Sequence, residues 1–174
     1  MVSIERIKAE EWQLLREMRL AALADAPEAF GQRFEEARGQ PDAEWRATTQ
    51  ASSHGERRAW FVARNEEPRP VGIVQARRRP PDDCLLFSMW VAPEARRSGA
   101  GRALVDAVEE WGANCGARRV VLWVIAGNEE ALRFYDRIDF RIMSEGPDAQ
   151  SGYAYGAIAM ERPINQASSG DTQR

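Results

Sequence analysis

The stretch Arg96–Val105, with the sequence RRSGAGRALV, places two glycines between arginines directly before a segment with helical periodicity. It follows an apolar run that ends at Ala92-Pro93, so it is predicted to be the turn between a buried strand and a helix. The first N–H groups of a helix have no intrahelical partner, and the helix dipole adds partial positive charge there. A tight turn without a ligand is the simpler alternative. A binding site for a phosphate group is the more specific prediction.

Hydrophobic patterning on both sides of this turn predicts an α/β domain with a mixed sheet. Two early apolar runs on either side of a turn at 66–70 predict an antiparallel hairpin. The strands that flank the turn and its helix predict a parallel pair with a right-handed crossover, and Gly116 is the expected C-cap of that helix. The expected strands are 2–8, 60–63, 71–76, 85–91, 120–125, 140–144 and 153–160, and the other expected helices are 10–24, one that starts at Asp42 as N-cap, and one from Asn128 to about Ile138.

The chain has 174 residues, which is enough for one domain with its own core. We expect this domain to cover residues 1–164, and we expect the polar residues 165–174 to be a disordered tail. No apolar run reaches the ~20 residues of a membrane span. Charged residues follow Met1 within a few positions, so we expect neither a signal peptide nor a membrane partner.

The composition argues against nucleic acid and metal as partners. The formal net charge is −3, and the one basic run, Arg77-Arg78-Arg79, is expected to be a solvated turn. The single histidine, His54, lies in a polar stretch, so neither a zinc site nor a Ser-His-Asp mechanism is expected. Cys84 and Cys115 lie in apolar segments without metal or redox spacing, and they are expected to be buried thiols of a cytoplasmic protein.

Two known phosphate-binding patterns do not fit the turn. A Walker A loop needs Gly-x-x-x-x-Gly-Lys-Ser/Thr, and the chain contains no such segment. The dinucleotide fingerprint Gly-x-Gly-x-x-Gly fits at Gly99 and Gly101 but has Leu104 in place of its third glycine. The acidic residue that would bind a ribose after the next strand is also missing from 120–127. Both kinds of site are therefore rejected.

The segment Arg96–Gly101 resembles the motif Gln/Arg-x-x-Gly-x-Gly/Ala of the GNAT superfamily of acyl-CoA-dependent N-acetyltransferases. Val91-Ala92-Pro93 is similar to the end of the family's fourth strand, and Asn128–Tyr135 is similar to its downstream N-x-x-A-x-x-x-Y segment. The family's glycine before Phe140 is replaced by Asp139, which tolerates a left-handed conformation better than most residues. The resemblance extends from Ile4 to about Ile164.

This resemblance implies the GNAT fold, in which helices flank a mixed, mostly antiparallel sheet and two central parallel strands splay apart. It implies acetyl-CoA as cosubstrate, without a metal, and places the pantetheine arm between the splayed strands. The backbone of Met89 and Val91 would bind that arm, with the Val91 N–H near the thioester carbonyl. Tyr135 is the counterpart of the catalytic acid that protonates the leaving thiolate. The implied cofactor-binding residues are Met89, Val91, Arg96, Arg97, Ser98, Gly99, Ala100, Gly101, Arg102, Asn128 and Tyr135.

Simpler roles for these residues stay open, because Asn128 is also a good N-cap and Tyr135 also suits a core position. The general base is open as well. A base is needed because an amine with a pKa near 10 is mostly protonated at neutral pH, and the strand 85–91 contains no acid. Glu28, Glu145, Asp148 and a water relay are the alternatives.

The resemblance thus implies an enzyme that transfers an acetyl group from acetyl-CoA directly to a primary amine. The acceptor, either a small molecule or a protein or peptide amine, is not identified. A CoA-binding or CoA-sensing module without turnover is the alternative, and nucleic-acid binding through Arg77–Arg79 is a third. Family members often pair through their sheets, so a homodimer is also an option.

Overall fold

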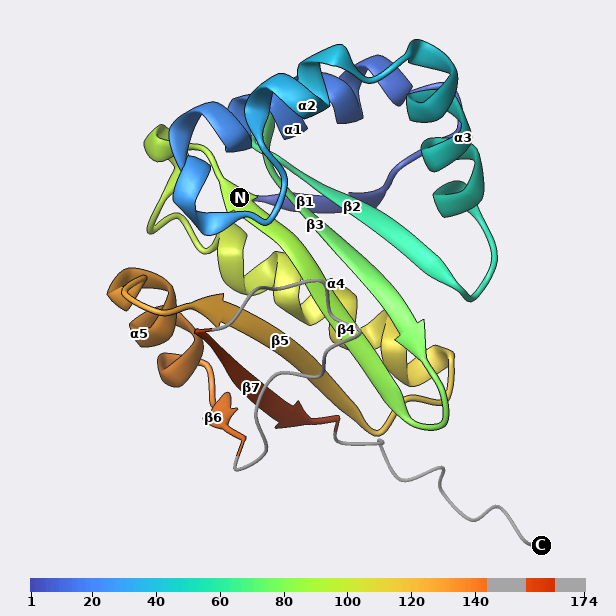
Figure 1. The fold of residues 1–174 in the computed structure, drawn as a ribbon. Coiled ribbons are helices and arrows are strands. Elements are labelled where there is room, and N and C mark those ends of the chain that lie inside the picture. Colours follow the sequence, from blue (N-terminus) through green and yellow to red (C-terminus); the bar gives the residue numbers. More distant parts are fainter. Residues whose placement is uncertain (144–155, 165–174) are drawn as a thin grey trace, which may run out of the picture.

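The computed structural model describes residues 1–143 and 156–164, which form a seven-stranded sheet with the order β1-β2-β3-β4-β5-β7-β6 (Figure 1). All neighbouring strands are antiparallel except β4 and β5. The strands are β1 (Ser3–Arg6), β2 (Arg58–Arg64), β3 (Pro70–Arg79), β4 (Asp83–Val91), β5 (Arg119–Ile125), β6 (Arg141–Ile142) and β7 (Ala157–Pro163). The helices are α1 (Trp12–Asp25), α2 (Phe34–Gly39), α3 (Asp42–Ser53), α4 (Ala100–Asn114) and α5 (Glu129–Arg137), with 3₁₀ turns η1 (Pro27–Ala29) and η2 (Pro93–Ala95).

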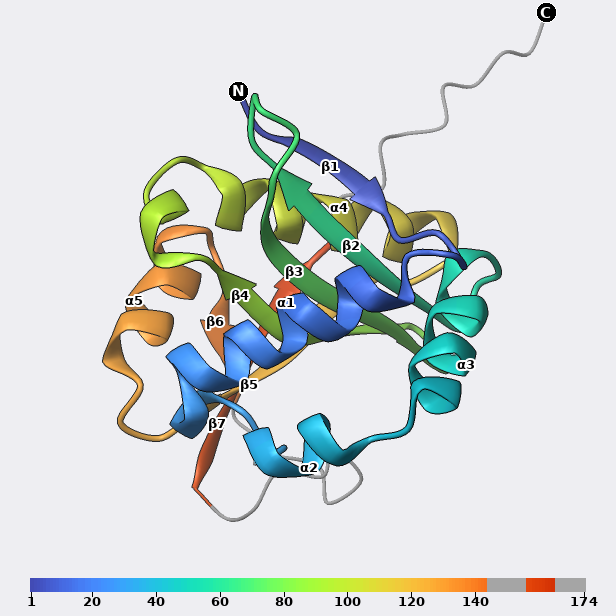
Figure 2. The same cartoon turned by 90° about the horizontal axis from the view of Figure 1, so that it is seen from above.

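Helices cover both faces of the sheet, because side chains of successive strand residues point to opposite faces. On β3, Val74 belongs to the core under α4, and its neighbour Ile73 belongs to the core under α1 and α3. The apolar positions of α4, among them Leu104, Val105 and Val108, are fully buried against the first face. Figure 2 shows α1 and α4 on the two sides of β2 and β3. The sheet therefore has a separate apolar core on each face.

The parallel pair opens into a gap along its length. The residue pairs between β4 and β5 run from Asp83–Arg119 to Leu85–Val121 and stop there within the described strands. On its other edge, each strand stays paired over a longer stretch. For example, β4 pairs with β3 as far as Val91, which lies opposite Gly72. Figure 1 shows the two strands diverging toward α5. This is the splayed strand pair that the resemblance to the GNAT superfamily implies.

A β-bulge lies on β4 where it borders the gap. The register with β3 shifts between Ile73 and Gln75, so that Ser88 and Met89 both lie opposite Val74. Ser88 has a φ of 53°, a left-handed conformation that few non-glycine residues adopt. A bulge of this kind bends a strand and interrupts its regular pairing. The bulge is therefore one local cause of the separation of β4 from β5.

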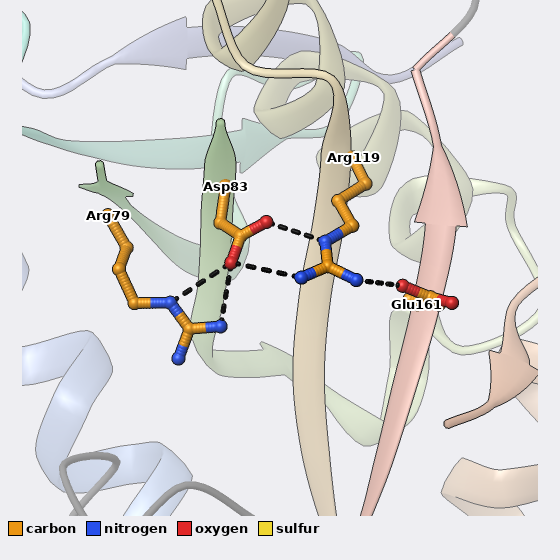
Figure 3. Close-up of polar contacts among 4 residues, drawn as sticks. All are labelled: Arg79, Asp83, Arg119 and Glu161. Carbon is orange, nitrogen blue, oxygen red and sulfur yellow. Dashed lines mark hydrogen bonds and ion pairs between the residues drawn. The ribbon is translucent and has the colours of Figure 1, made fainter. Parts of the chain in front are cut away.

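An ionic network ties the strands together where β4 and β5 are still paired (Figure 3). Asp83 accepts hydrogen bonds from Arg79 Nη2 at 2.7 Å and from Arg119 Nε at 2.6 Å. Arg119 Nη1 also donates to Glu161 Oε2 at 2.6 Å, so the network joins β3, β4, β5 and β7. Burial alone would raise the pKa of Asp83, but the hydrogen bonds from Arg119 and Arg79 outweigh it and hold the pKa below its ordinary value.

Most sequence-based elements agree with the structure, but α2 was not expected, and β7 continues to Pro163 instead of ending at Met160. The arginine run Arg77–Arg79 does not form a turn, because all three residues continue β3 and pair with Leu85, Cys84 and Asp83. The N-cap of α3 is Pro41, and Asp42 is the first helical residue. The C-cap of α4 is Cys115 and not Gly116, which follows it with a φ of 80°, the left-handed conformation of a glycine just after a helix.

Some expectations fall partly or wholly outside the described residues. Tyr153–Tyr155, predicted to begin the last strand, and Ser144, predicted to end the one before it, belong to this group. The predicted tail 165–174 does too. None of the helices in the described part of the chain combines the length and apolar character that a membrane-spanning helix needs.

Candidate functional site

A narrow cleft of about 60 Å³ lies between the diverging strands β4 and β5. Side chains from β4, β5, α5 and the segment around η1 form its walls, and none of those that line it in the described structure is charged. A wider, open hollow of about 610 Å³ between α1 and α3 contains none of the predicted site residues. The cleft residues are Ala29, Phe30, Leu86, Phe87, Ser88, Met89, Leu122, Trp123, Val124, Ile125, Asn128, Ala131 and Tyr135.

The free edge of β4 presents backbone polar groups to the gap. The N–H of Ala92 donates to the carbonyl of Val71 on β3 at 2.8 Å. Successive N–H groups of a regular strand point to opposite edges, so the N–H of Val91 faces the gap, whereas Met89 lies in the bulge, where this alternation is interrupted. No strand pairs with this part of β4 on the β5 side among the described residues. An extended ligand can therefore form backbone hydrogen bonds here.

The β4–α4 turn, residues 96–102, gathers further N–H groups at the start of α4. Arg97 and Gly99 have φ values of 69° and 90°, which turn the chain sharply into the helix. The first helical hydrogen bond is donated by the N–H of Ala103 to the carbonyl of Gly99 at 3.0 Å. The N–H of Ala100 donates to Ser98 Oγ at 3.3 Å, and the N–H groups before Ala103 have no intrahelical partner. This geometry suits an anion such as a diphosphate.

The arginines of the turn differ in their partners, although the sequence analysis gave them the same role. Arg96 donates to Asp25 and to the carbonyl of Val91. Arg102 donates to Asp106 one helical turn away at 2.9 Å. Arg97 is exposed, and its side chain makes no hydrogen bond or ion pair within the described part of the chain. Arg97 is therefore the arginine of this turn whose charge is available to a ligand.

Gly101 has a packing role that the sequence analysis did not foresee. A Cβ atom at this position would meet Phe134 Cζ at 3.2 Å and Met89 Cε at 3.4 Å. The space that the missing side chain leaves is thus filled by α5 and β4. A larger residue at 101 would therefore crowd Phe134 beside Tyr135 as well as the predicted diphosphate site.

Helix α5 brings the remaining predicted residues to the cleft. Asn128 is its N-cap and lines the cleft, and its Oδ1 accepts from the N–H of Ala131 at 3.1 Å. Tyr135 is buried, and its ring packs edge-on against Phe134 and Phe140 at centroid distances of 5.1 and 5.4 Å. Asp139 has a φ of 66°, so it adopts the left-handed conformation expected of it.

Acidic groups near the cleft are few. Glu28 lies in η1 and is exposed, whereas Glu145 and Asp148 lie outside the described residues. Asp25, which the sequence analysis missed, accepts a hydrogen bond from Trp90 Nε1 at 2.8 Å as well as from Arg96. Its partners lie 65 and 71 residues away, so no local sequence signal could reveal it. Within residues 1–143 and 156–164, no three His, Cys, Asp or Glu side chains gather to hold a metal ion.

The turn, the splayed strands and α5 lie within one known sequence family. A family model described as the acetyltransferase (GNAT) family matches residues 15–140. The chain belongs to the GNAT family. This match includes β4, the β4–α4 turn and α5, which carry the motifs on which the sequence-based resemblance depends.

Curated GNAT relatives match only part of the chain. An uncharacterized N-acetyltransferase, YobR, of Bacillus subtilis (strain 168) is 38% identical over 60 residues, which cover 34% of this chain and 24% of that protein. A 5-NmdU N-acetyltransferase of Pseudomonas phage PaMx11 is 36% identical over 90 residues, which cover 51% of this chain and 61% of that protein. The matches thus span less than two thirds of the length of either relative.

Solved structures match nearly the whole chain. An acetyltransferase of the GNAT family from Staphylococcus aureus Mu50 has a TM-score of 0.73 at 19% identity, covering 94% of this chain and 99% of that one. PaiA N-acetyltransferase from Thermoplasma acidophilum, solved in complex with coenzyme A, has a TM-score of 0.72 at 15% identity over 94% and 99% of the two chains. At these identities the likeness shows the fold, which is the GNAT fold.

Proposed function

We propose that the protein is an N-acetyltransferase that transfers an acetyl group from acetyl-CoA to a primary amine. The observation that carries this proposal is the continuity of two sites. The gap beside β4 offers backbone hydrogen bonds to an extended arm, and the β4–α4 turn at the end of β4 offers N–H groups to a diphosphate. A pantetheine arm attached to a diphosphate is a ligand of this form.

The residues that would bind acetyl-CoA offer hydrogen-bonding groups for the amides of its arm and positive charge for its diphosphate. Met89 and Val91 offer backbone groups to the amides of the arm, and the Asn128 NH₂ group offers a further donor. Ser98, Gly99, Ala100 and Gly101 would contribute backbone to the diphosphate site, and Arg97 would add a charge that has no ion-pair partner within residues 1–143 and 156–164. Arg96 and Arg102 support the site through their own ion pairs. The bound acetyl-CoA supplies the activated acetyl group.

Two groups of the cleft would act on the reacting atoms. The Val91 N–H is directed into the gap, where it can donate to a thioester carbonyl oxygen and stabilise the charge that develops there. Tyr135 lines the same cleft, and its phenolic hydroxyl is a proton donor that can protonate a leaving thiolate. We therefore assign Tyr135 as the catalytic acid.

Direct transfer to the amine is favoured over an acyl-enzyme. Cys84 lies where β4 and β5 are paired, and burial raises the pKa of its thiol to about 12. Cys115 is the C-cap of α4, and burial raises its pKa as well. Neither cysteine lines the cleft, so neither thiol is available as a nucleophile. We propose that water carries the proton of the amine out of the cleft, with Glu28 on η1 as its acceptor.

The acceptor is proposed to be a primary amine attached to an uncharged or aromatic group. The described cleft wall on the side of η1 is formed by Phe30, Phe87 and Trp123, and it contains no carboxylate to bind a polycation. The name of one relative, 5-NmdU N-acetyltransferase, is consistent with such an acceptor. A small-molecule amine therefore ranks ahead of a peptide amine.

The test is a screen for release of CoA thiol from acetyl-CoA over a panel of amines. The panel includes aromatic methylamines, amino acids, polyamines and peptides with free N-termini. Amine-dependent thiol release, with acetylated amine confirmed by mass spectrometry, supports the proposal. Tight acetyl-CoA binding without thiol release for any amine would instead favour a CoA-sensing module, for which the cleft without an acidic lining residue is the supporting observation.

A further inference from the structure

A carboxylate at the end of α1 connects the turn to the strand beside it. Asp25 Oδ2 accepts a hydrogen bond from Trp90 Nε1 on β4 at 2.8 Å and an ion-paired one from Arg96 Nη2. Arg96 Nε donates in turn to the carbonyl of Val91 at 3.3 Å. The side chains of Asp25 and Arg96 are 25% and 40% exposed, so the contact is partly shielded from water. One carboxylate oxygen therefore joins α1, β4 and the β4–α4 turn.

Asp25 occupies a position that helix electrostatics disfavour. It is the last residue of α1, where the helix dipole repels negative charge, and no basic residue lies in that last turn to offset it. The favourable contacts come instead from Trp90 and Arg96, which are distant in sequence. The contact thus stabilises a tertiary arrangement and adds nothing to the helix itself.

The position of Asp25 in the chain relates both sides of the proposed site. Directly after it the chain forms η1, and Ala29 and Phe30 then line the cleft on the side where we place the acceptor. On its other side, Arg96 is the first residue of the turn proposed to bind the diphosphate. The ion pair between Arg96 and Asp25 therefore links this turn to the chain that leads into the η1 wall.

We propose that Asp25 is a positioning residue that fixes the β4–α4 turn for acyl-CoA and couples cosubstrate binding to the η1 wall of the acceptor pocket. This inference rests on the proposed function. Asp25 orients the Arg96 guanidinium, whose planar fork of N–H groups donates to the Asp25 carboxylate and to the Val91 carbonyl at the same time. With that fork held, the turn is ordered before the ligand arrives, and binding avoids part of the ordering cost.

The first experiment measures the dissociation constants of acetyl-CoA and desulfo-CoA by calorimetry. Asp25→Asn keeps an oxygen for Trp90 and removes only the charge, and we expect both dissociation constants to rise about tenfold, which corresponds to about 1.4 kcal/mol. Arg96→Gln removes the same contact from the side of the turn and should raise both dissociation constants by a similar factor. The Arg96 side chain is half-exposed, so its replacement should not disrupt the fold. The double variant should add little to either single variant, because both remove one interaction.

The control is Glu35→Gln, which removes an exposed carboxylate that pairs with Arg38 at 3.5 Å on α2. It should keep the wild-type dissociation constants. Hydrogen exchange gives the second readout: acetyl-CoA should slow amide exchange in residues 22–30 of the wild type. At saturating acetyl-CoA, this protection should be lost in Asp25→Asn, whereas a residue with only a structural role would lower thermal stability without changing the ligand-induced protection.

The results separate this inference from the proposed function. If the wild-type protein binds neither acetyl-CoA nor desulfo-CoA, the proposed function is wrong, and the proposed coupling through Asp25 is wrong as well. If wild type binds and Asp25→Asn and Arg96→Gln bind within twofold of it, only the positioning role is overturned. Additive effects in the double variant, or full protection of residues 22–30 in Asp25→Asn, would overturn it too.

Discussion

Asp83→Asn tests the ionic network at the paired end of β4 and β5, where the gap begins. The carboxylate is only 10% exposed, whereas the side chains of Arg79 and Arg119 are 25% and 40% exposed. Breaking a fully buried ion pair costs about 3–5 kcal/mol, and an exposed pair is worth about 0–1 kcal/mol. Asparagine keeps one oxygen acceptor, and Arg119 keeps Glu161 at 2.6 Å. We therefore expect a loss of about 2 kcal/mol, midway between these limits.

The assay is urea unfolding followed by tryptophan fluorescence, with thermal unfolding as a second measure. A loss of about 2 kcal/mol corresponds to a decrease of roughly 4–8 °C in Tm for a domain of this size. Glu67→Gln is the matched control, because Glu67 pairs with Arg69 at 3.0 Å but both side chains are about 70% exposed, at 69% and 74%. This control should change stability by less than about 0.5 kcal/mol.

The pH dependence has a defined sign. The folded-state pKa of Asp83 lies below its ordinary value, because hydrogen bonds from the two arginines outweigh burial. The contribution of Asp83 is therefore complete above the unfolded pKa of about 3.9 and is lost as the pH falls through the folded pKa. The difference between wild type and Asp83→Asn should be constant near neutral pH and shrink only in acid. A difference under 0.5 kcal/mol at pH 7, or one that grows in acid, would refute this reasoning.

Three further predictions concern the cleft and α4. Tyr135→Phe should lower turnover about 10²-fold with little change in KM for acetyl-CoA, and kinetics within threefold of wild type would make Tyr135 a packing residue. Arg97→Gln should weaken CoA binding about three- to tenfold in calorimetry, with a smaller effect at high salt, where screening already weakens the contact. Gly112→Ala should lower the free energy of unfolding in urea by about 1–3 kcal/mol, because the new Cβ would lie 2.9 Å from Cys84 Cβ. Gly39→Ala is the control: its Cβ would meet nothing within 4 Å, so it should not destabilise the protein.

Local sequence signals predicted much of the fold and the local backbone geometry around some of the candidate site residues. Asn128 was expected as a cap and caps α5, and Asp139 was expected to be left-handed and has a φ of 66°. These features depend on a few neighbouring residues, so a short stretch of sequence contains the information. The helical periodicity after the glycine turn likewise predicted α4, whose apolar residues, among them Leu104 and Val108, are buried.

Contacts between distant segments could not be predicted in this way. Asp25 appears unremarkable in the sequence, because its role depends on a strand and a turn more than sixty residues away. Gly101 was explained by a ligand, although Phe134 also requires it to lack a side chain. The arginine run was expected to be a turn because prolines follow it, yet pairing with β4 extends the strand through Arg79. In each case tertiary packing decided what local preference left open.

The most direct test of the account is thermal unfolding of the wild-type protein with acetyl-CoA and with desulfo-CoA. Both compounds carry the diphosphate for the β4–α4 turn and an arm for the gap beside β4. At a hundredfold excess over its dissociation constant, each should stabilise the protein by about 2.7 kcal/mol. That corresponds to an increase of roughly 5–10 °C in Tm. No change in Tm with either compound at millimolar concentration would contradict the assignment of the turn and the gap as an acyl-CoA site.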